Sequence, residues 1–134
     1  MGKLRIRISV LDDDVSVRNA LSRLLRASDF DVRAYGTGEE FLAAIDGFHP
    51  HCAIIDLHMP GMSGREVQRL VAKTESDIAV IVITGHDSSK SRTECLSDGA
   101  SAYLTKPVDE MLLLTAIHDA TAKQATLKRK QAIH

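Results

Sequence analysis

Short runs of apolar residues alternate along the chain with longer segments in which apolar residues recur at helical spacing. The short runs predict five strands, at residues 6–11, 32–35, 52–55, 78–83 and 102–104. The longer segments predict five helices, over about 15–27, 38–45, 65–73, 88–97 and 110–123, with Asp14 and Asp109 as caps of the first and the last. Because helices connect the strands, the pattern predicts a parallel sheet between two helical layers, a three-layer α/β/α sandwich.

A polar or charged residue follows four of these strands at the point where each strand ends. Asp12 and Asp13 come after the first strand, Asp56 after the third, Thr84 after the fourth and Lys106 shortly after the fifth. Ligands of parallel α/β sheets bind outside the carboxyl ends of the strands, where these side chains would gather. The sequence therefore predicts one site at that edge, and its residue types indicate a site that accepts a phosphoryl group.

The chemistry of this site follows from its charges. Three carboxylates in a partly desolvated pocket repel one another, and cations have to offset that repulsion. Mg²⁺ (or Mn²⁺) prefers hard oxygen ligands, and Mg²⁺ is the usual ion where phosphoryl groups are handled. Asp56 stands alone at its strand end, which favours it as the nucleophile, while Asp12 and Asp13 hold the metal. Lys106 and the Thr84 hydroxyl are then predicted to contact phosphoryl oxygens.

Length and composition limit the domain organisation and the function classes. With 134 residues and 44% hydrophobic content, the chain can build one core but no second domain of ordinary size. We predict one domain over residues 1–122 and a basic tail, or the start of a linker, over 123–134. The net charge of -1 argues against general nucleic-acid binding. Cys52 and Cys95 lack C-x-x-C spacing, and neither a membrane span nor a signal sequence is predicted, which indicates a reduced cytoplasmic protein.

Four segments carry a resemblance to a known family, in matching order, over about residues 4–122. They are Val-Leu-Asp-Asp-Asp at 10–14, Ile-Ile-Asp-Leu-His-Met-Pro-Gly-Met-Ser-Gly at 54–64, Val-Ile-Thr-Gly-His at 82–86 and Tyr-Leu-Thr-Lys-Pro at 103–107. The chain resembles the receiver domain of two-component response regulators. Residues 81–86, with Glu-Phe-Leu at 40–42, are similar to its nitrogen-fixation regulator (FixJ-like) branch. The resemblance implies a flavodoxin-like fold with five parallel strands in the order 2-1-3-4-5.

The resemblance also implies a role for each residue of the site. Asp56 would be phosphorylated by a sensor histidine kinase or a phosphotransfer protein. Asp13 would bind the metal directly, Asp12 would act largely through water, and the backbone carbonyl of His58 would complete the protein's metal ligands. Such a protein is a signalling switch that catalyses only its own phosphorylation and dephosphorylation, and it is not a metabolic enzyme.

Thr84 and Tyr103 would form the switch pair of this family. When the phosphoryl group draws the Thr84 hydroxyl inward, the Tyr103 ring would rotate into the vacated space. Phosphorylation has only to favour an existing minor conformation by the ~1–3 kcal/mol that is typical of coupling between sites. The resemblance further implies a cis peptide bond between Lys106 and Pro107.

The last two predicted helices differ in their apolar residues. Residues 88–97 offer almost no apolar face besides Cys95 and Leu96, so this helix is expected to be short, frayed or mobile. The last helix has more apolar residues than one buried stripe needs, and Met111, Leu112 and Leu114 fall partly outside it. Exposed apolar area marks contact surfaces. In this family the fourth helix, fifth strand and fifth helix commonly form the partner or dimer face, so a phosphorylation-strengthened homodimer or docking surface is expected there.

Two histidines, His58 and His86, are the residues of the predicted site that are most specific to this chain. They follow Asp56 and Thr84 by two residues each, so their side chains should flank the phosphoryl group and meet an attacking water. We hypothesise that they set the lifetime of the phosphate by positioning or excluding water. The alternative is that both are solvated loop residues. A metal site made of the histidines is not favoured, because no third ligand stands at suitable spacing.

Other functions stay open at the level of the sequence. The run Asp-Asp-Asp-Val at 12–15 also fits the D-x-D-x-V pattern of haloacid-dehalogenase-like phosphatases, with Asp12 as nucleophile and Asp14 as acid/base. That mechanism leaves Asp56 idle. A protein-binding adaptor on the same fold, without phosphorylation, is the second alternative. A flavin-binding flavodoxin is the weakest, because no phosphate-binding loop follows the first strand.

The tail contains the basic run Lys-Arg-Lys at 128–130 and lacks hydrophobic anchors. It fits either the start of a linker to a DNA-binding output domain or the natural end of a stand-alone receiver. Three basic residues fall short of a nucleic-acid-binding patch. A solvated, disordered end is therefore the favoured expectation.

Overall fold

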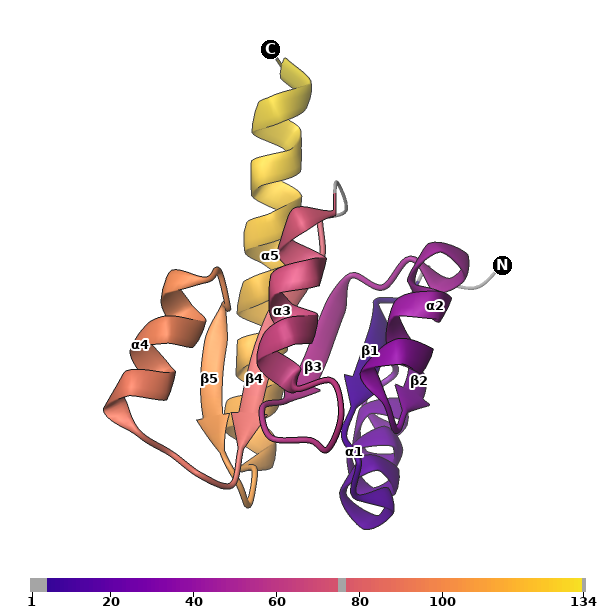
Figure 1. The fold of residues 1–134 in the computed structure, drawn as a ribbon. Helices are drawn as coiled ribbons and strands as arrows, with labels where there is room; N and C mark the ends of the chain where they lie inside the picture. The colour runs from indigo at the N-terminus through magenta and orange to yellow at the C-terminus, as the bar shows by residue number, and fades with distance from the viewer. Residues whose placement is uncertain (1–4, 75–76, 134) are drawn as a thin grey trace.

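A computed structural model describes residues 5–74 and 77–133 of the chain (Figure 1). In chain order the elements are β1 (Arg7–Leu11), α1 (Val15–Ala27), β2 (Asp31–Tyr35), α2 (Gly38–Phe48), β3 (Cys52–Asp56), α3 (Gly64–Lys73), β4 (Ala79–Thr84), α4 (Ser89–Ser97), β5 (Ala102–Thr105) and α5 (Glu110–Ile133). Neighbouring strands are all parallel, and the order across the sheet is β2-β1-β3-β4-β5. The predicted sandwich and strand order are confirmed.

Helices cover both faces of the sheet. On one face, Leu21 of α1 and Leu113 of α5 pack with sheet residues such as Ile54 in one apolar core. On the other face, Phe41 of α2 and Val67 of α3 belong to a second core. Successive residues of a strand point to opposite faces, so the central strands β3 and β4 are buried along their whole length. Polar residues that follow them therefore lie at the end of a rigid, buried element.

Side-chain caps fix where the helices begin. The carboxylate of Asp14 accepts backbone N–H groups in the first turn of α1, as predicted. The predicted cap Asp109 accepts an N–H from the first turn of α5 at 2.9 Å. The other three helices are capped in the same way by Thr37, Ser63 and Ser88. Because a side-chain oxygen satisfies a free N–H at each start, these residues set the helix boundaries.

Two helices extend beyond their predicted ends. α2 continues past Ile45 to Phe48, whose ring lies under the Arg33 guanidinium. The prediction that the last helix ends near Lys123 is wrong, because α5 continues to Ile133. Residues 123–133 are mostly good helix formers and contain neither Gly nor Pro, so nothing stops the helix there. Figure 1 shows the distal part of α5 standing clear of the sheet.

The last two helices differ in apolar burial, as predicted. α4 forms over its predicted length, with Cys95 as the buried residue. On α5, Met111 is 70% exposed and Leu112 is 61% exposed, whereas Leu114 packs partly against the core. Within the described ranges, none of the helices combines the length and the apolar content that crossing a bilayer requires. The exposed apolar residues of α5 are thus a local feature of one surface.

Candidate functional site

The carboxyl ends of β1, β3, β4 and β5 lie level at one edge of the sheet. The register pairs Leu11 with Ile55 between β1 and β3, and Thr84 with Thr105 between β4 and β5. The residues that follow these positions are therefore brought side by side from distant parts of the sequence. This is the edge at which the strand-end residues were expected to gather.

Asp12, Asp13 and Asp56 meet at this edge, with ligand oxygens that all lie within 4.8 Å of one another. Asp12 and Asp56 are buried, at 0% and 3% exposure, and Asp13 is exposed. Carboxylate oxygens are the ligands that Mg²⁺ prefers, and these lie close enough together to share one ion through direct or water-mediated contacts. Among the described residues, no other group of three or more His, Cys, Asp or Glu has metal-binding geometry.

Lys106 completes the charged cluster. Its Nζ lies 2.9 Å from Asp12 Oδ2 and 3.5 Å from Asp56 Oδ1. Apart from this ion pair, Asp12 Oδ2 has no hydrogen-bond partner in the part of the chain that the structure describes, and Oδ1 accepts the Asp14 N–H at 2.9 Å. Protein groups thus engage both oxygens of Asp12, which fits an indirect role toward a metal. The peptide bond between Lys106 and Pro107 is cis, as expected.

The cluster shifts the pKa values of its members. Burial, the neighbouring Asp12 carboxylate and a hydrogen bond with Asp13 raise the pKa of Asp56 to about 6, against the lowering effect of Lys106 and the His58 backbone N–H. Burial lowers the pKa of Lys106, but its contacts with Asp12 and Asp56 outweigh this effect and leave that pKa above its usual value. With every carboxylate ionised, one ammonium faces three negative charges. A divalent cation would neutralise the remainder.

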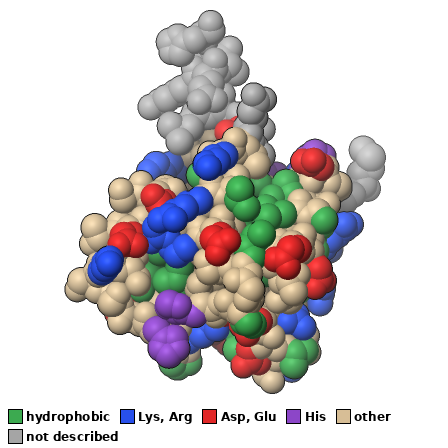
Figure 2. Space-filling model, viewed as in Figure 1, with side chains coloured by type: hydrophobic (Ala, Val, Ile, Leu, Met, Phe, Trp, Pro, Cys, Tyr) green, Lys and Arg blue, Asp and Glu red, His purple; other side chains and the backbone are tan. Residues whose placement is uncertain are grey.

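The other predicted site residues surround the cluster. Thr84 is fully buried, and its Oγ1 accepts the His86 N–H at 3.0 Å. The rings of His58 and His86 are exposed and meet edge to face, with centroids 5.2 Å apart. Figure 2 shows a group of histidine side chains, in purple, on the surface of the molecule. Tyr103 on β5 is 5% exposed, so its ring lies inside the fold.

Two further residues, Gly64 and Arg18, shape this site. Gly64 begins α3 against the backbone of Asp56, so that a Cβ there would overlap the Asp56 carbonyl oxygen and lie 2.8 Å from Leu57 Cα. Arg18 Nη1 donates a hydrogen bond to the Asp12 carbonyl oxygen at 2.7 Å. A turn signal marks Gly64 in the sequence, but its close contact depends on the tertiary structure. Nothing in the spacing of Arg18 indicates its contact.

Comparison with known proteins decides the family. The family model for the response regulator receiver domain matches residues 8–118. The chain belongs to this family. As a receiver domain it is a unit of two-component response regulators, in which the family's role is to accept a phosphoryl group.

Curated relatives and solved structures agree with this assignment. Nodulation protein W of Bradyrhizobium diazoefficiens is 32% identical, over 93% of this chain and 54% of its own length. Transcriptional regulatory protein FixJ of the same organism is 29% identical, over 94% of this chain and 62% of its own length. The crystal structure of a receiver domain protein from Methanospirillum hungatei superposes with a TM-score of 0.85 at 29% identity, covering 92% of this chain and 98% of that one. The receiver domain thus spans about half to two thirds of these two curated relatives.

Proposed function

We propose that Asp56 accepts a phosphoryl group from a sensor histidine kinase or a phosphotransfer protein, in a reaction that requires Mg²⁺ or Mn²⁺. The convergence of Asp12, Asp13 and Asp56 beside Lys106 supports this proposal. A carboxylate oxygen of Asp56 attacks phosphorus, the P–N bond of a phosphohistidine breaks, and the nitrogen leaves with the bonding electrons. Water later hydrolyses the aspartyl phosphate to the carboxylate and inorganic phosphate.

Each surrounding residue has a proposed task in this reaction. Asp13, Asp56 and the backbone carbonyl of His58 would hold the metal, with Asp12 acting largely through water. A metal at this position supplies positive charge to the transferring group. The ammonium of Lys106 would pair with one phosphoryl oxygen, and the Thr84 hydroxyl would donate to another. Thr84 and Tyr103 would then form the switch pair, and the protein would catalyse only its own phosphorylation and dephosphorylation.

Treatment with acetyl phosphate tests the proposed acceptor. We expect one phosphoryl group to be added in the presence of Mg²⁺ and none in the presence of EDTA. Reduction of the acyl phosphate with borohydride, followed by peptide mass mapping, is expected to place the modification at Asp56. Modification of Asp12 would instead favour the phosphatase mechanism, with Asp14 as acid/base. A chain that takes up no phosphoryl group under either condition would favour the adaptor.

The two histidines are proposed to control the lifetime of the aspartyl phosphate. Their rings contact each other at the surface beside the acceptor, where together they would shield the phosphorus from water. His58→Ala is therefore expected to shorten the phosphate half-life several-fold, as measured by loss of the phosphorylated mass after removal of acetyl phosphate. His118→Ala, which removes an exposed histidine of α5, serves as the control. An unchanged half-life for His58→Ala would rule out the shielding role.

The partners and the wider context are also proposed. The α4–β5–α5 surface, with the exposed Met111 and Leu112, would carry a homodimer or docking contact that phosphorylation strengthens. Residues 1–122 would form the receiver, and 123–134 would be a basic tail or the start of a linker. One relative is a transcriptional regulatory protein, so a DNA-binding output domain is proposed for a longer form of the chain. Cys52 and Cys95 are buried free thiols, which suits a reducing cytoplasm.

A further inference from the structure

Polar contacts, more than apolar packing, hold α4 on the domain. Cys95 is the single buried residue of this helix, all of whose residues the structure describes, and Leu96 is 44% exposed. Burying one such side chain contributes only about 2 kcal/mol, which is little for a helix of nine residues. The position of α4 therefore depends on its hydrogen bonds and ion pairs.

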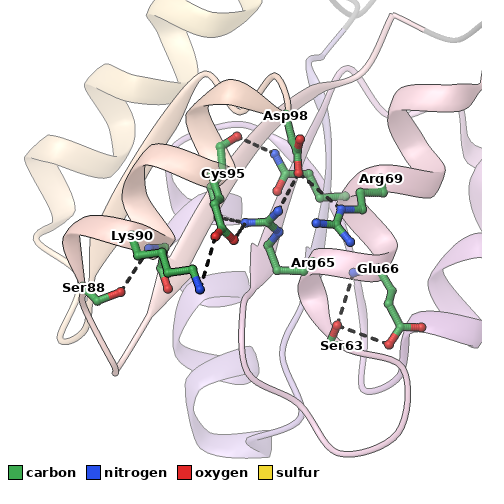
Figure 3. Close-up of polar contacts among 11 residues, drawn as sticks. Ser63, Arg65, Glu66, Arg69, Ser88, Lys90, Cys95 and Asp98 are labelled. Carbon is green, nitrogen blue, oxygen red and sulfur yellow. Dashed lines mark hydrogen bonds and ion pairs between the residues drawn. The ribbon is translucent and has the colours of Figure 1, made fainter.

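Arg65, in the first turn of α3, reaches across to α4 and makes most of these contacts (Figure 3). Its Nη1 lies 3.0 Å from Glu94 Oε2, and its Nη2 lies 2.7 Å from Asp98 Oδ2. The Arg65 side chain is 17% exposed, whereas those of Glu94 and Asp98 are 44% and 32% exposed, so solvent screens these pairs in part. Beside them, Gln68 Nε2 donates to the Cys95 carbonyl oxygen at 2.8 Å. We name Arg65, Gln68, Glu94 and Asp98 the α3–α4 clamp.

The α3–α4 clamp is linked to the backbone at Asp56, the proposed phosphoryl acceptor. Arg65 directly follows Gly64, which packs against the backbone of Asp56 and Leu57. The Gly64 N–H also donates to the Leu57 carbonyl oxygen at 3.1 Å. With no side chain between the two segments, a displacement of the Asp56 backbone has to move the start of α3. Arg65, one residue further on, would move with it.

At its other contact, α4 covers Tyr103. The guanidinium carbon of Arg92 lies 4.7 Å from the centroid of the Tyr103 ring, within the range of a cation–π interaction. The Tyr103 hydroxyl is buried, and its polar neighbours are the Ser88 backbone and the Asp87 side chain. The hydroxyl depends for hydrogen bonding on these two neighbours at the start of α4, and losing both while it stays buried would cost about 1–3 kcal/mol. The inward position of the ring is therefore one that α4 has to maintain.

Two features indicate that α4 and the Tyr103 ring can adopt a different position. A cavity of about 300 Å³ lies beside the ring, so Tyr103 has space to turn outward once Arg92 moves. Within the described part of the chain, Arg65 Nε and Gln68 Oε1 are buried without hydrogen-bond partners. A different placement of α4 that supplied either partner would recover part of that desolvation free energy. The observed placement of α4 therefore leaves two buried polar atoms, Arg65 Nε and Gln68 Oε1, whose hydrogen bonds another placement could supply.

We propose that Arg65 is a positioning residue that holds α4, through the α3–α4 clamp, where Arg92 keeps the Tyr103 ring inward. Arg65 thereby couples the backbone at Asp56 to the α4–β5–α5 surface. The meaning of this coupling for signalling rests on the proposed switch pair: the ring already lies inward here, so phosphorylation would stabilise the inward position instead of creating it. The effect of Arg65 on Tyr103 is, however, already defined in the unphosphorylated protein, and it can be measured without any phosphoryl donor.

The chain offers a specific reporter for Tyr103. It contains two tyrosines and no tryptophan, so a Tyr35→Phe background labelled with fluorotyrosine gives one fluorine NMR signal, from Tyr103. Arg92→Met, which removes the cover of the ring, defines the signal of an uncovered Tyr103. Arg69→Met is the matched control for Arg65, because Arg69 lies on the same helix 3.4 Å from Asp98 but is 59% exposed. Arg65→Met is the test variant.

We expect Arg65→Met to shift or split the signal toward that of Arg92→Met, and Arg69→Met to leave it at the wild-type position. Asp98→Asn, which removes an acceptor and keeps Arg65, should shift the signal in the same direction even if Arg65→Met does not fold. The two changes combined should shift it by less than the sum of the single shifts. A wild-type signal in both folded Arg65→Met and Asp98→Asn would overturn the proposal, as would an unchanged signal in Arg92→Met. Failure of Asp56 to accept phosphate would leave these outcomes unaffected.

Discussion

The Asp56→Asn variant is expected to accept no detectable phosphoryl group from acetyl phosphate, yet to unfold at a higher urea concentration than the wild type when both are metal-free. The amide is no nucleophile at this position, so the acyl phosphate cannot form. The same amide cannot ionise, so the repulsion from Asp12 and the desolvation of a buried carboxylate disappear. Function and stability are therefore expected to change in opposite directions.

The pH dependence identifies the cause of the added stability. Because the pKa of Asp56 is raised to about 6 in the folded protein, the folded state binds its proton more tightly than the unfolded state does. The contribution of Asp56 to wild-type stability should therefore be most favourable below the unfolded pKa of about 4 and be lost as the pH rises through about 6. We expect Asp56→Asn to raise the free energy of unfolding by about 1–3 kcal/mol near pH 8 and by much less near pH 4.

Urea unfolding in EDTA at the two pH values measures this difference, and mass spectrometry measures phosphoryl uptake. Asp46→Asn removes an exposed carboxylate of α2 and is the control for both measurements. It should take up phosphate as the wild type does and change stability little at either pH. A stability gain of equal size at both pH values would contradict the assignment of the effect to ionised Asp56.

Gly64→Ala is expected to lower the free energy of unfolding by about 3 kcal/mol, the upper part of the range for overpacked sites. The added Cβ would overlap the Asp56 carbonyl oxygen and lie 2.8 Å from Leu57 Cα, and both neighbours are backbone atoms that cannot move independently. Relief requires a shift of α3 or of the segment after β3. The acceptor carboxylate would move with that segment, so phosphoryl uptake should also fall.

Gly47→Ala is the matched control, because a Cβ at Gly47 in α2 meets nothing within 4 Å. There the same change should stabilise the protein by about 0.5–1 kcal/mol through the higher helix propensity of alanine. Urea unfolding of the two variants side by side checks both signs. Equal effects of the two substitutions would show that the contact of Gly64 with the Asp56 backbone is not the determining feature.

The sequence predicts which side chains meet at this edge because they stand at strand ends. In a parallel βα fold, the carboxyl ends of the strands share one edge, so the positions of Asp12, Asp13, Asp56 and Lys106 imply their proximity. Burial of the strands adds a second constraint, because a charge at the end of an apolar run has to be compensated. Local order and fold class together therefore suffice to predict which side chains meet.

Contacts between helices are not predictable in this way. Arg65 and Glu94 are 29 positions apart, and their meeting depends on how α3 and α4 lie on the sheet. The contact of Arg92 with Tyr103 likewise depends on the orientation of a helix that has little apolar patterning. The end of α5 is missed for a different reason. Residues 123–133 carry no stop signal, and a basic composition distinguishes poorly between an exposed helix and a solvated tail.

α5 is so long that a small rotation at its base moves its far end by a much larger distance. It begins at Glu110, close in sequence to Lys106, and its 24 residues extend beyond the opposite edge of the sheet (Figure 1). A straight helix of this size is about 36 Å long, so a tilt of about 5° at its base sweeps its far end through about 3 Å. A rotation small enough to leave the core packing intact is thus amplified to roughly the diameter of an atom at Ile133.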